Sequence, residues 1–181
     1  AGLQDFAQRY LVWLQARDVE GWQYQRGEFD MTASLAGLDD LQLKGRIDRL
    51  DQGRGGTTQL IDYKTGGKAG LDAKVREPLE DTQLAFYAAQ VLLAGEAPKA
   101  LSAIYLALDD RKGILAVEHK DLADSAQALI NGLAQDWHRL RAGAPMHALG
   151  EGPVCDTCEA RGLCRRDHWA DLSVASTGDE A

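Results

Sequence analysis

Two aspartates and a lysine in the middle of the chain have the spacing of a catalytic group carried by neighbouring strands. Asp48 precedes a glycine-rich turn, and Asp62 and Lys64 follow it. Side chains two residues apart on a strand share a face, so Asp62 and Lys64 should project together. A turn centred near Gly55 would make Asp48 the cross-strand neighbour of Asp62, at a distance where two carboxylates repel. The spacing therefore predicts a cation between them.

The chemistry that suits this group is metal-assisted attack by water. Mg²⁺ or Mn²⁺ prefers oxygen ligands and is often held by one or two carboxylates together with water and substrate phosphate. Lys64 could orient or activate the attacking water, or stabilise the charge that develops on a phosphate. The alternative is that Asp48, Asp62 and Lys64 form a charge ladder on a solvated sheet face, because surface ion pairs are common.

Periodicity and turn residues predict the elements that must position this group. Helical spacing and alternation predict helices at 3–17, 78–94 and 122–141 and strands at 22–35, 41–51, 57–65, 100–108 and 113–119. Pro78 is expected to open the second helix and Gly95 to end it, and a turn is expected at 37–40. The fold class that follows is α/β, a mixed β-sheet flanked by helices.

Length and composition indicate one main domain. A chain of 181 residues with 45% hydrophobic residues can bury one ordinary core, expected over 1–149, with a cysteine-bearing tail at 150–169 and disorder at 170–181. No segment reaches roughly 18 consecutive apolar residues, so we expect a soluble, cytoplasmic protein. The net charge of −8 disfavours broad attraction to a polyanion. DNA binding would require the acidity to lie at a metal site and on solvated faces, or a partner to deliver the DNA.

The motifs together resemble those of the PD-(D/E)XK nuclease superfamily, specifically the RecB-like and AddB-type nuclease domains. The pattern is GRIDRLD at 45–51, a glycine-rich turn, IDYKTG at 61–66 and QLAFY at 83–87, within a resemblance that covers Glu28–Cys164. It implies a restriction-endonuclease-like fold. It also implies that Asp48 and Asp62 bind a metal ion together with the backbone carbonyl of Tyr63. Lys64 would complete the D-x-K pair.

Four further residues enter through the same resemblance. Gln83 and Tyr87 match a Q-x-x-x-Y helix motif, and a spacing of four places both on one helical face. The resemblance implies that they position DNA or Lys64. The alternative is that Tyr87 is a core aromatic and Gln83 a helix-surface amide. Arg46 is a candidate for positioning substrate and Glu28 for the site itself, although charges on strands usually face water.

The tail carries all three cysteines of the chain, Cys155, Cys158 and Cys164. Cysteines clustered in an otherwise cysteine-free cytosolic chain more often bind metal than form disulfides. Their spacing resembles the end of the iron–sulfur staple of AddB-type nucleases, in which a 4Fe-4S cluster takes a fourth cysteine from upstream, so they should lie near the N-terminal edge. That fourth cysteine is missing here. The alternatives are Zn²⁺ bound by the three thiolates and His168, or three unligated thiols.

The resemblance implies that the intact protein hydrolyses DNA phosphodiester bonds, as an exonuclease rather than an endonuclease. Its partners would be DNA and the helicase domain or subunit of a recombination and repair complex. RecB-like domains usually carry an upstream active-site histidine, whereas the histidines here all follow Lys64, at His119, His138, His147 and His168. These gaps indicate an N-terminally trimmed fragment, which alone could be inactive. Two other classes stay open, a non-catalytic DNA-binding or scaffolding module and a zinc-stapled protein-interaction domain.

Overall fold

The computed structural model forms two compact units, Ala1–Gln135 and Asp136–Ala181. It describes residues 2–35, 37–77, 79, 81–95, 98–110, 113–145, 155 and 158–164. The first unit contains the sheet and every candidate site residue apart from the cysteines and His168. The segment expected to be disordered, 170–181, lies outside the described residues. Within the described part, no helix is both long and apolar enough to cross a membrane.

A five-stranded mixed sheet forms the centre of the first unit, in the order β1-β2-β3-β4-β5. The strands are β1 (Gln23–Leu35), β2 (Leu38–Gln52), β3 (Thr57–Lys64), β4 (Ala100–Asp110) and β5 (Gly113–Glu118). Neighbouring strands run antiparallel except for β3 and β4, which are parallel. A parallel pair needs a crossover connection, and two helices between β3 and β4 supply it. The predicted α/β fold with a mixed sheet is confirmed.

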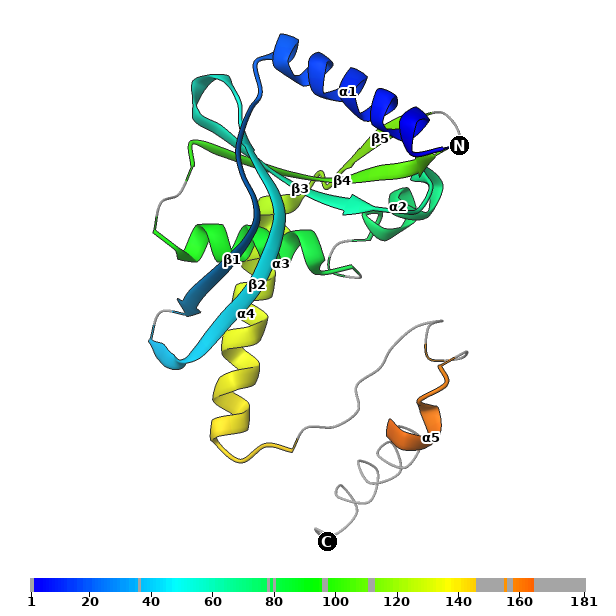
Figure 1. The fold of residues 1–181 in the computed structure, drawn as a ribbon. Helices are drawn as coiled ribbons and strands as arrows, with labels where there is room; N and C mark the ends of the chain where they lie inside the picture. Colours follow the sequence, from blue (N-terminus) through cyan, green and yellow to red (C-terminus); the bar gives the residue numbers. More distant parts are fainter. Residues whose placement is uncertain are drawn as a thin grey trace, which may run out of the picture. The chain divides into compact units, whose positions relative to one another are not determined.

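Helices cover the sheet on both sides, with α1 on one face and α3 on the other (Figure 1). They are α1 (Leu3–Glu20), α2 (Lys68–Lys74), α3 (Gln83–Leu93) and α4 (Leu122–Arg141), followed by the short α5 (Arg161–Cys164). On the first face, Tyr10 and Trp13 of α1 pack against a cluster of Ile61, Ile104 and Leu106. On the other face, most residues of α3 are buried. The two faces of β2 and β3 therefore meet different environments.

Three local predictions differ from the structure. The second helix begins at Gln83 instead of Pro78, which itself lies outside the described residues. Leu79 has a φ of 65°, a left-handed conformation that a helix cannot contain. Helix α2 was not predicted, because its seven residues include Gly70 and bury only Leu71, too little for an amphipathic pattern.

The turn predicted at 37–40 is also shorter in the structure. Leu38 already belongs to β2 and pairs with Leu35, so only two residues separate the strands. Gly37 has a φ of 76° and provides the reversal that other residues adopt with strain. Pairing with β1 thus overrides the turn-forming composition of the Gly-Leu-Asp-Asp segment.

Candidate active site

The register of β2 and β3 brings Asp48 and Asp62 together. The last ladder pair is Arg49 with Ile61, so Asp48 lies opposite Asp62 one step further along. At that step, Asp48 Oδ2 accepts a hydrogen bond from the backbone N–H of Tyr63 at 2.9 Å. The two aspartates therefore stand on the same face of adjacent strands, as the turn position predicted.

Asp62 is almost fully buried, with 1% of its surface exposed. Burial raises the pKa of this carboxyl group, and the charges of Asp48 and Asp81 raise it further, whereas the neighbouring Lys64 acts to lower it. Lys64 Nζ lies 2.7 Å from Asp62 Oδ2. Beyond this ion pair, Oδ2 accepts no hydrogen bond from the residues that the structure describes. Among the described residues, this oxygen is thus contacted only by the Lys64 ammonium group, which leaves one of its two lone-pair sites for a further partner.

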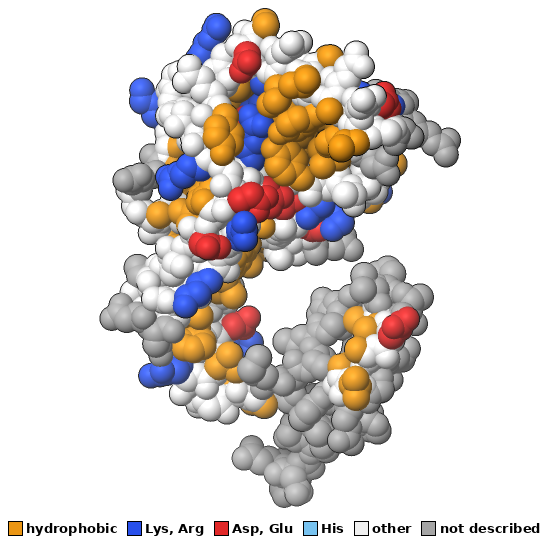
Figure 2. All heavy atoms as spheres, viewed as in Figure 1, with side chains coloured by type: hydrophobic (Ala, Val, Ile, Leu, Met, Phe, Trp, Pro, Cys, Tyr) orange, Lys and Arg blue, Asp and Glu red, His pale blue; other side chains and the backbone are white. Residues whose placement is uncertain are grey.

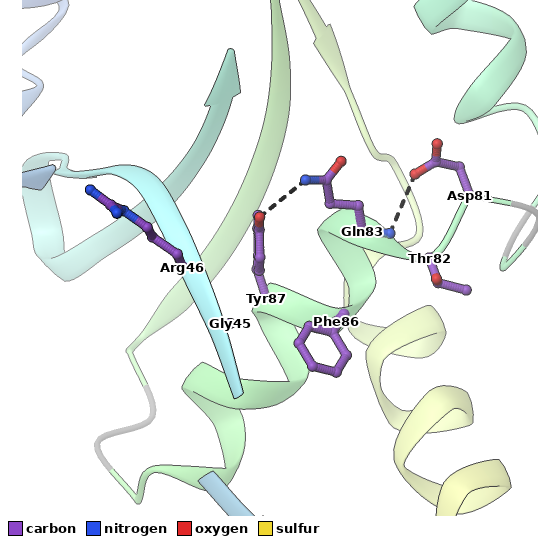
Figure 3. Close-up of a pocket in the computed structure, with 7 residues that line it drawn as sticks. All are labelled: Gly45, Arg46, Asp81, Thr82, Gln83, Phe86 and Tyr87. Atoms are coloured by element: carbon purple, nitrogen blue, oxygen red, sulfur yellow. Dashed lines mark hydrogen bonds between the residues drawn. The ribbon is translucent and has the colours of Figure 1, made fainter. Parts of the chain in front are cut away.

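Gln83, the first residue of α3, connects Asp62 and Lys64, the two members of the D-x-K pair. Its Nε2 donates to Asp62 Oδ1 at 2.7 Å, and its Oε1 accepts from Lys64 Nζ at 2.7 Å. The same Nε2 donates to Tyr87 OH at 3.0 Å, as Figure 3 shows. Burial raises the pKa of Tyr87, and the nearby carboxylates act in the same direction. Gln83 is therefore a half-buried amide that bridges Asp62, Lys64 and Tyr87, and Tyr87 itself is buried in the core.

Sequence reasoning missed Asp81 and Tyr105, which stand beside this bridge. Tyr105 pairs with Asp62 in the ladder between β3 and β4, and its hydroxyl donates to Asp81 Oδ1. Asp81 also accepts from Lys74 Nζ at 2.6 Å and from the backbone N–H of Gln83 at 3.3 Å. Burial opposes ionisation of Asp81, but the hydrogen bonds from Lys74 and Tyr105 hold its pKa below the usual value. It is thus a charged group that lies just before the start of α3, next to the site.

Glu28 and Arg46 lie at the exposed edge of the same region. Pairing of Gly27 with Arg49 and of Phe29 with Ile47 places Glu28 opposite Asp48. Glu28 Oε2 lies 3.0 Å from Arg46 Nε, with side chains 61% and 62% exposed. Glu28, Asp48, Asp62 and Tyr105 consequently form a row across four strands.

An open cleft of about 550 Å³ adjoins this row. It is lined by Gly45, Arg46, Asp81, Thr82, Gln83, Phe86 and Tyr87 (Figure 3). Figure 2 shows acidic side chains gathered in the middle of one face of the molecule, with Lys and Arg side chains beside them. Gln83 belongs to the cleft lining and also contacts Asp62 and Lys64, so it links the cleft to the buried carboxylate. Asp48, Asp62 and Lys64 do not themselves line the cleft.

The donor set suits a hard divalent cation with few protein ligands. Among the described residues, no three His, Cys, Asp or Glu side chains form a metal-binding group. A pair of carboxylates is sufficient for Mg²⁺, which usually keeps several waters and binds substrate phosphate. The acceptor capacity left on Asp62 Oδ2 fits this requirement. Asp48 contributes a second carboxylate on the same face.

The cysteines belong to the second unit. Cys158 and Cys164 are exposed and Cys155 is half-buried. Within the described part of the chain they do not form a metal-binding cluster, and His168 lies outside that part. The 4Fe-4S cluster, the alternative Zn²⁺ site and their expected closeness to the N-terminal edge stay predictions.

Comparison with known proteins identifies the family. A family model described as the PD-(D/E)XK nuclease superfamily matches residues 1–165. The search of curated proteins found no match. Membership in this superfamily indicates hydrolysis of phosphodiester bonds, implies DNA as substrate and usually entails a divalent metal ion. Because the match covers most of the chain, the protein belongs to the PD-(D/E)XK nuclease superfamily.

Proposed function

We propose that this protein is a Mg²⁺- or Mn²⁺-dependent deoxyribonuclease whose catalytic residues are Asp48, Asp62 and Lys64. The observation that carries the proposal is the buried Asp62 carboxylate, which faces Asp48 on the next strand and keeps acceptor capacity on Oδ2. Lys64 occupies only one of the two lone-pair sites of this oxygen, so a metal ion can bind to the other. Asp48 and Asp62 together are therefore suited to bind a divalent metal ion.

Asp48, Asp62 and the backbone carbonyl of Tyr63 would hold the metal ion. When bound, such an ion lowers the pKa of water and neutralises charge on a phosphate. Lys64 is held by Asp62 and by Gln83, so its ammonium group has a fixed position next to the carboxylates. From there it can orient the attacking water or donate to a phosphate oxygen.

Gln83, Tyr87 and Arg46 would position the substrate. Gln83 and Tyr87 line the cleft together and are joined by a hydrogen bond, which limits the rotamers of both. Arg46 lies at the rim with an exposed side chain whose partner, Glu28, is also exposed. Such a surface pair costs little to break, so the guanidinium can turn to a phosphate, which it binds in bidentate geometry.

The finer proposal is exonuclease action within a recombination and repair helicase–nuclease. Its support is the motif order GRIDRLD, IDYKTG and QLAFY, which resembles that of RecB-like nuclease domains. In such a complex the partner helicase would deliver DNA ends, which offsets the unfavourable net charge of −8.

The test is cleavage of end-labelled linear DNA and of closed circular DNA by the purified 181-residue chain. We expect Mg²⁺-dependent shortening of linear DNA only, abolished by a chelator. Asp62→Asn should reduce the rate at least about 100-fold, because it removes a charge that binds the metal. The matched control is Asp5→Asn, which removes one carboxylate from an exposed ion pair with Arg9 on α1 and should not change the rate.

Two outcomes would contradict the proposal. Cleavage by Asp62→Asn at the wild-type rate would exclude the assigned site. Metal-independent DNA binding without cleavage would instead favour the scaffolding module. Nicking of the circular substrate would leave the nuclease in place and overturn only the exonuclease proposal.

A further inference from the structure

A buried polar network lies on the face of β2 and β3 opposite the proposed site. Its centre is Asp51, whose side chain is fully buried. Arg49 donates to both oxygens of this carboxylate, from Nε to Oδ1 at 2.6 Å and from NH2 to Oδ2 at 3.0 Å. Arg17 of α1 donates from Nε to Oδ2 at 2.9 Å. Paired, bidentate contacts of this kind fix the orientation of an arginine.

Arg49 extends the network to two tyrosines. Its NH1 donates to Tyr10 OH at 3.0 Å, and the hydroxyls of Tyr10 and Tyr63 share a hydrogen bond of 2.8 Å. Burial raises the pKa of Tyr63, and its hydrogen bond with Tyr10 acts in the same direction. Both rings also meet edge to face. The phenol of Tyr63 is consequently anchored to α1.

The anchored residue sits between two proposed catalytic residues. Tyr63 separates Asp62 from Lys64 on β3, and its side chain projects to the opposite face. Its backbone N–H donates to Asp48 Oδ2 at 2.9 Å. Tyr63 thus bonds to Tyr10 of α1 through its hydroxyl group. Through its backbone N–H it orients Asp48, a proposed metal ligand.

We propose that Tyr63, anchored by Tyr10, is a positioning residue that sets the relative placement of Asp48 and Asp62. This inference rests on the proposed function of those carboxylates. Loss of the anchor frees the Tyr63 ring and loosens the amide that holds Asp48 Oδ2. Partners that orient metal-binding carboxylates commonly affect metal affinity by about 10- to 100-fold. Because Tyr63 acts through its backbone, the effect of its hydroxyl should lie at the lower end.

The contrasting possibility is that the network only stabilises the fold. Both readings predict a lower unfolding midpoint when a hydroxyl is removed, because a buried hydrogen bond is lost. Only the positioning role predicts weaker binding of a divalent ion by protein that remains folded. Metal affinity therefore separates the two, independently of catalytic activity.

The experiment titrates Mn²⁺ into the full chain and follows the electron paramagnetic resonance signal of the free ion, well below the unfolding midpoints. Tyr63→Phe and Tyr10→Phe should each weaken binding about tenfold. The double variant should lose no more than Tyr10→Phe alone, because that substitution already removes the bond between the two hydroxyls together with the bond from Arg49. Tyr24→Phe is the matched control. The centre of its ring lies 5.3 Å from Arg49 Cζ, but the residue is 60% exposed, so the substitution removes a hydroxyl group near the network without removing one of its bonds.

The outcomes distinguish this inference from the proposed function. Wild-type Mn²⁺ affinity in folded Tyr63→Phe and Tyr10→Phe would overturn the positioning role and leave the nuclease site intact. Identical titrations of the wild type and Asp62→Asn would overturn the metal site and the positioning role with it. If Tyr63→Phe does not fold, Tyr10→Phe removes the shared bond from another element, together with a bond from Arg49, and decides the question.

Discussion

Each face of the β2–β3 pair buries an aspartate, and the two carboxylates differ in their hydrogen-bond partners. Asp51 faces α1, and both of its oxygens accept hydrogen bonds from arginines. Asp62 faces α3, where its Oδ1 accepts from Gln83 and its Oδ2 accepts none from the described residues. Removing Asp51 would leave buried arginines without a partner, whereas Oδ2 of Asp62 has only Lys64 beside it among the described residues and can also bind a ligand. The proposed metal site therefore lies on the face towards α3, and the network on the face towards α1 supports it.

The largest expected effect is a loss of stability when the buried network around Asp51 is disrupted. Asp51→Asn leaves Arg17 and Arg49 buried without their carboxylate, which should lower the free energy of unfolding by about 3–5 kcal/mol. Urea denaturation of the variant and of Asp5→Asn, a surface control, measures the difference. A loss below about 1 kcal/mol would mean that the network does not stabilise the fold.

A smaller effect is expected where Gln83 bridges the face towards α3. Gln83→Leu keeps the size of the side chain but removes its bonds to Asp62, Lys64 and Tyr87. We expect kcat to fall about 10- to 100-fold with less change in KM, because a positioning contact is lost. Gln127→Leu, which removes a helix-surface bond to Asn131 on α4, provides the control. Equal kinetics of both variants would contradict the bridging role.

The comparison also predicts opposite stability effects for the two aspartates. Burial raises the pKa of Asp62, so this group favours folding below the ordinary aspartate pKa of about 4 and disfavours it once the pH exceeds its raised value. Metal-free Asp62→Asn should accordingly be more stable than the wild type at neutral pH, by on the order of 1 kcal/mol. Thermal unfolding in chelator should show this difference growing from pH 4 to pH 7. If the stability difference between Asp62→Asn and the wild type shrinks from pH 4 to pH 7, the pKa of Asp62 is not raised and the prediction is wrong.

The smallest effect concerns the exposed edge of the face towards α3. Arg46→Ala breaks a solvent-exposed pair with Glu28, so stability should change by less than about 1 kcal/mol. If Arg46 contacts phosphate, KM for DNA should rise several-fold with kcat nearly unchanged. Steady-state kinetics at two salt concentrations check this, because a lost phosphate contact also weakens the salt dependence.

Much of the site could be predicted because it depends on local rules. A turn near Gly55 fixes the antiparallel register and alternation fixes the faces, so the shared face of Asp48, Asp62 and Lys64 followed from spacing, whereas their catalytic role was implied by the family resemblance. Arg17 carried a usable signal as well, because it continues the helical face of Tyr10 and Trp13, yet a charged residue on a helix is usually taken as exposed.

The remaining parts depend on contacts that spacing does not encode. Tyr105 reaches the site through the parallel pairing of β3 and β4, which requires the crossover to be known. Asp81 joins it from a connection without periodicity, where Lys74 and Tyr105 hold it. The start of α3 was misplaced for the same reason, since Leu79 interrupts the helix with a positive φ.

Calorimetric titration of Mn²⁺ into the metal-free chain tests the central claim most directly. The account predicts about one bound ion per chain in the wild type and in Asp5→Asn, because two carboxylates with water suffice for one hard cation. It predicts loss of that binding in Asp48→Asn and in Asp62→Asn. Equal Mn²⁺ binding in all four proteins would contradict the claim that the face towards α3 holds the catalytic metal.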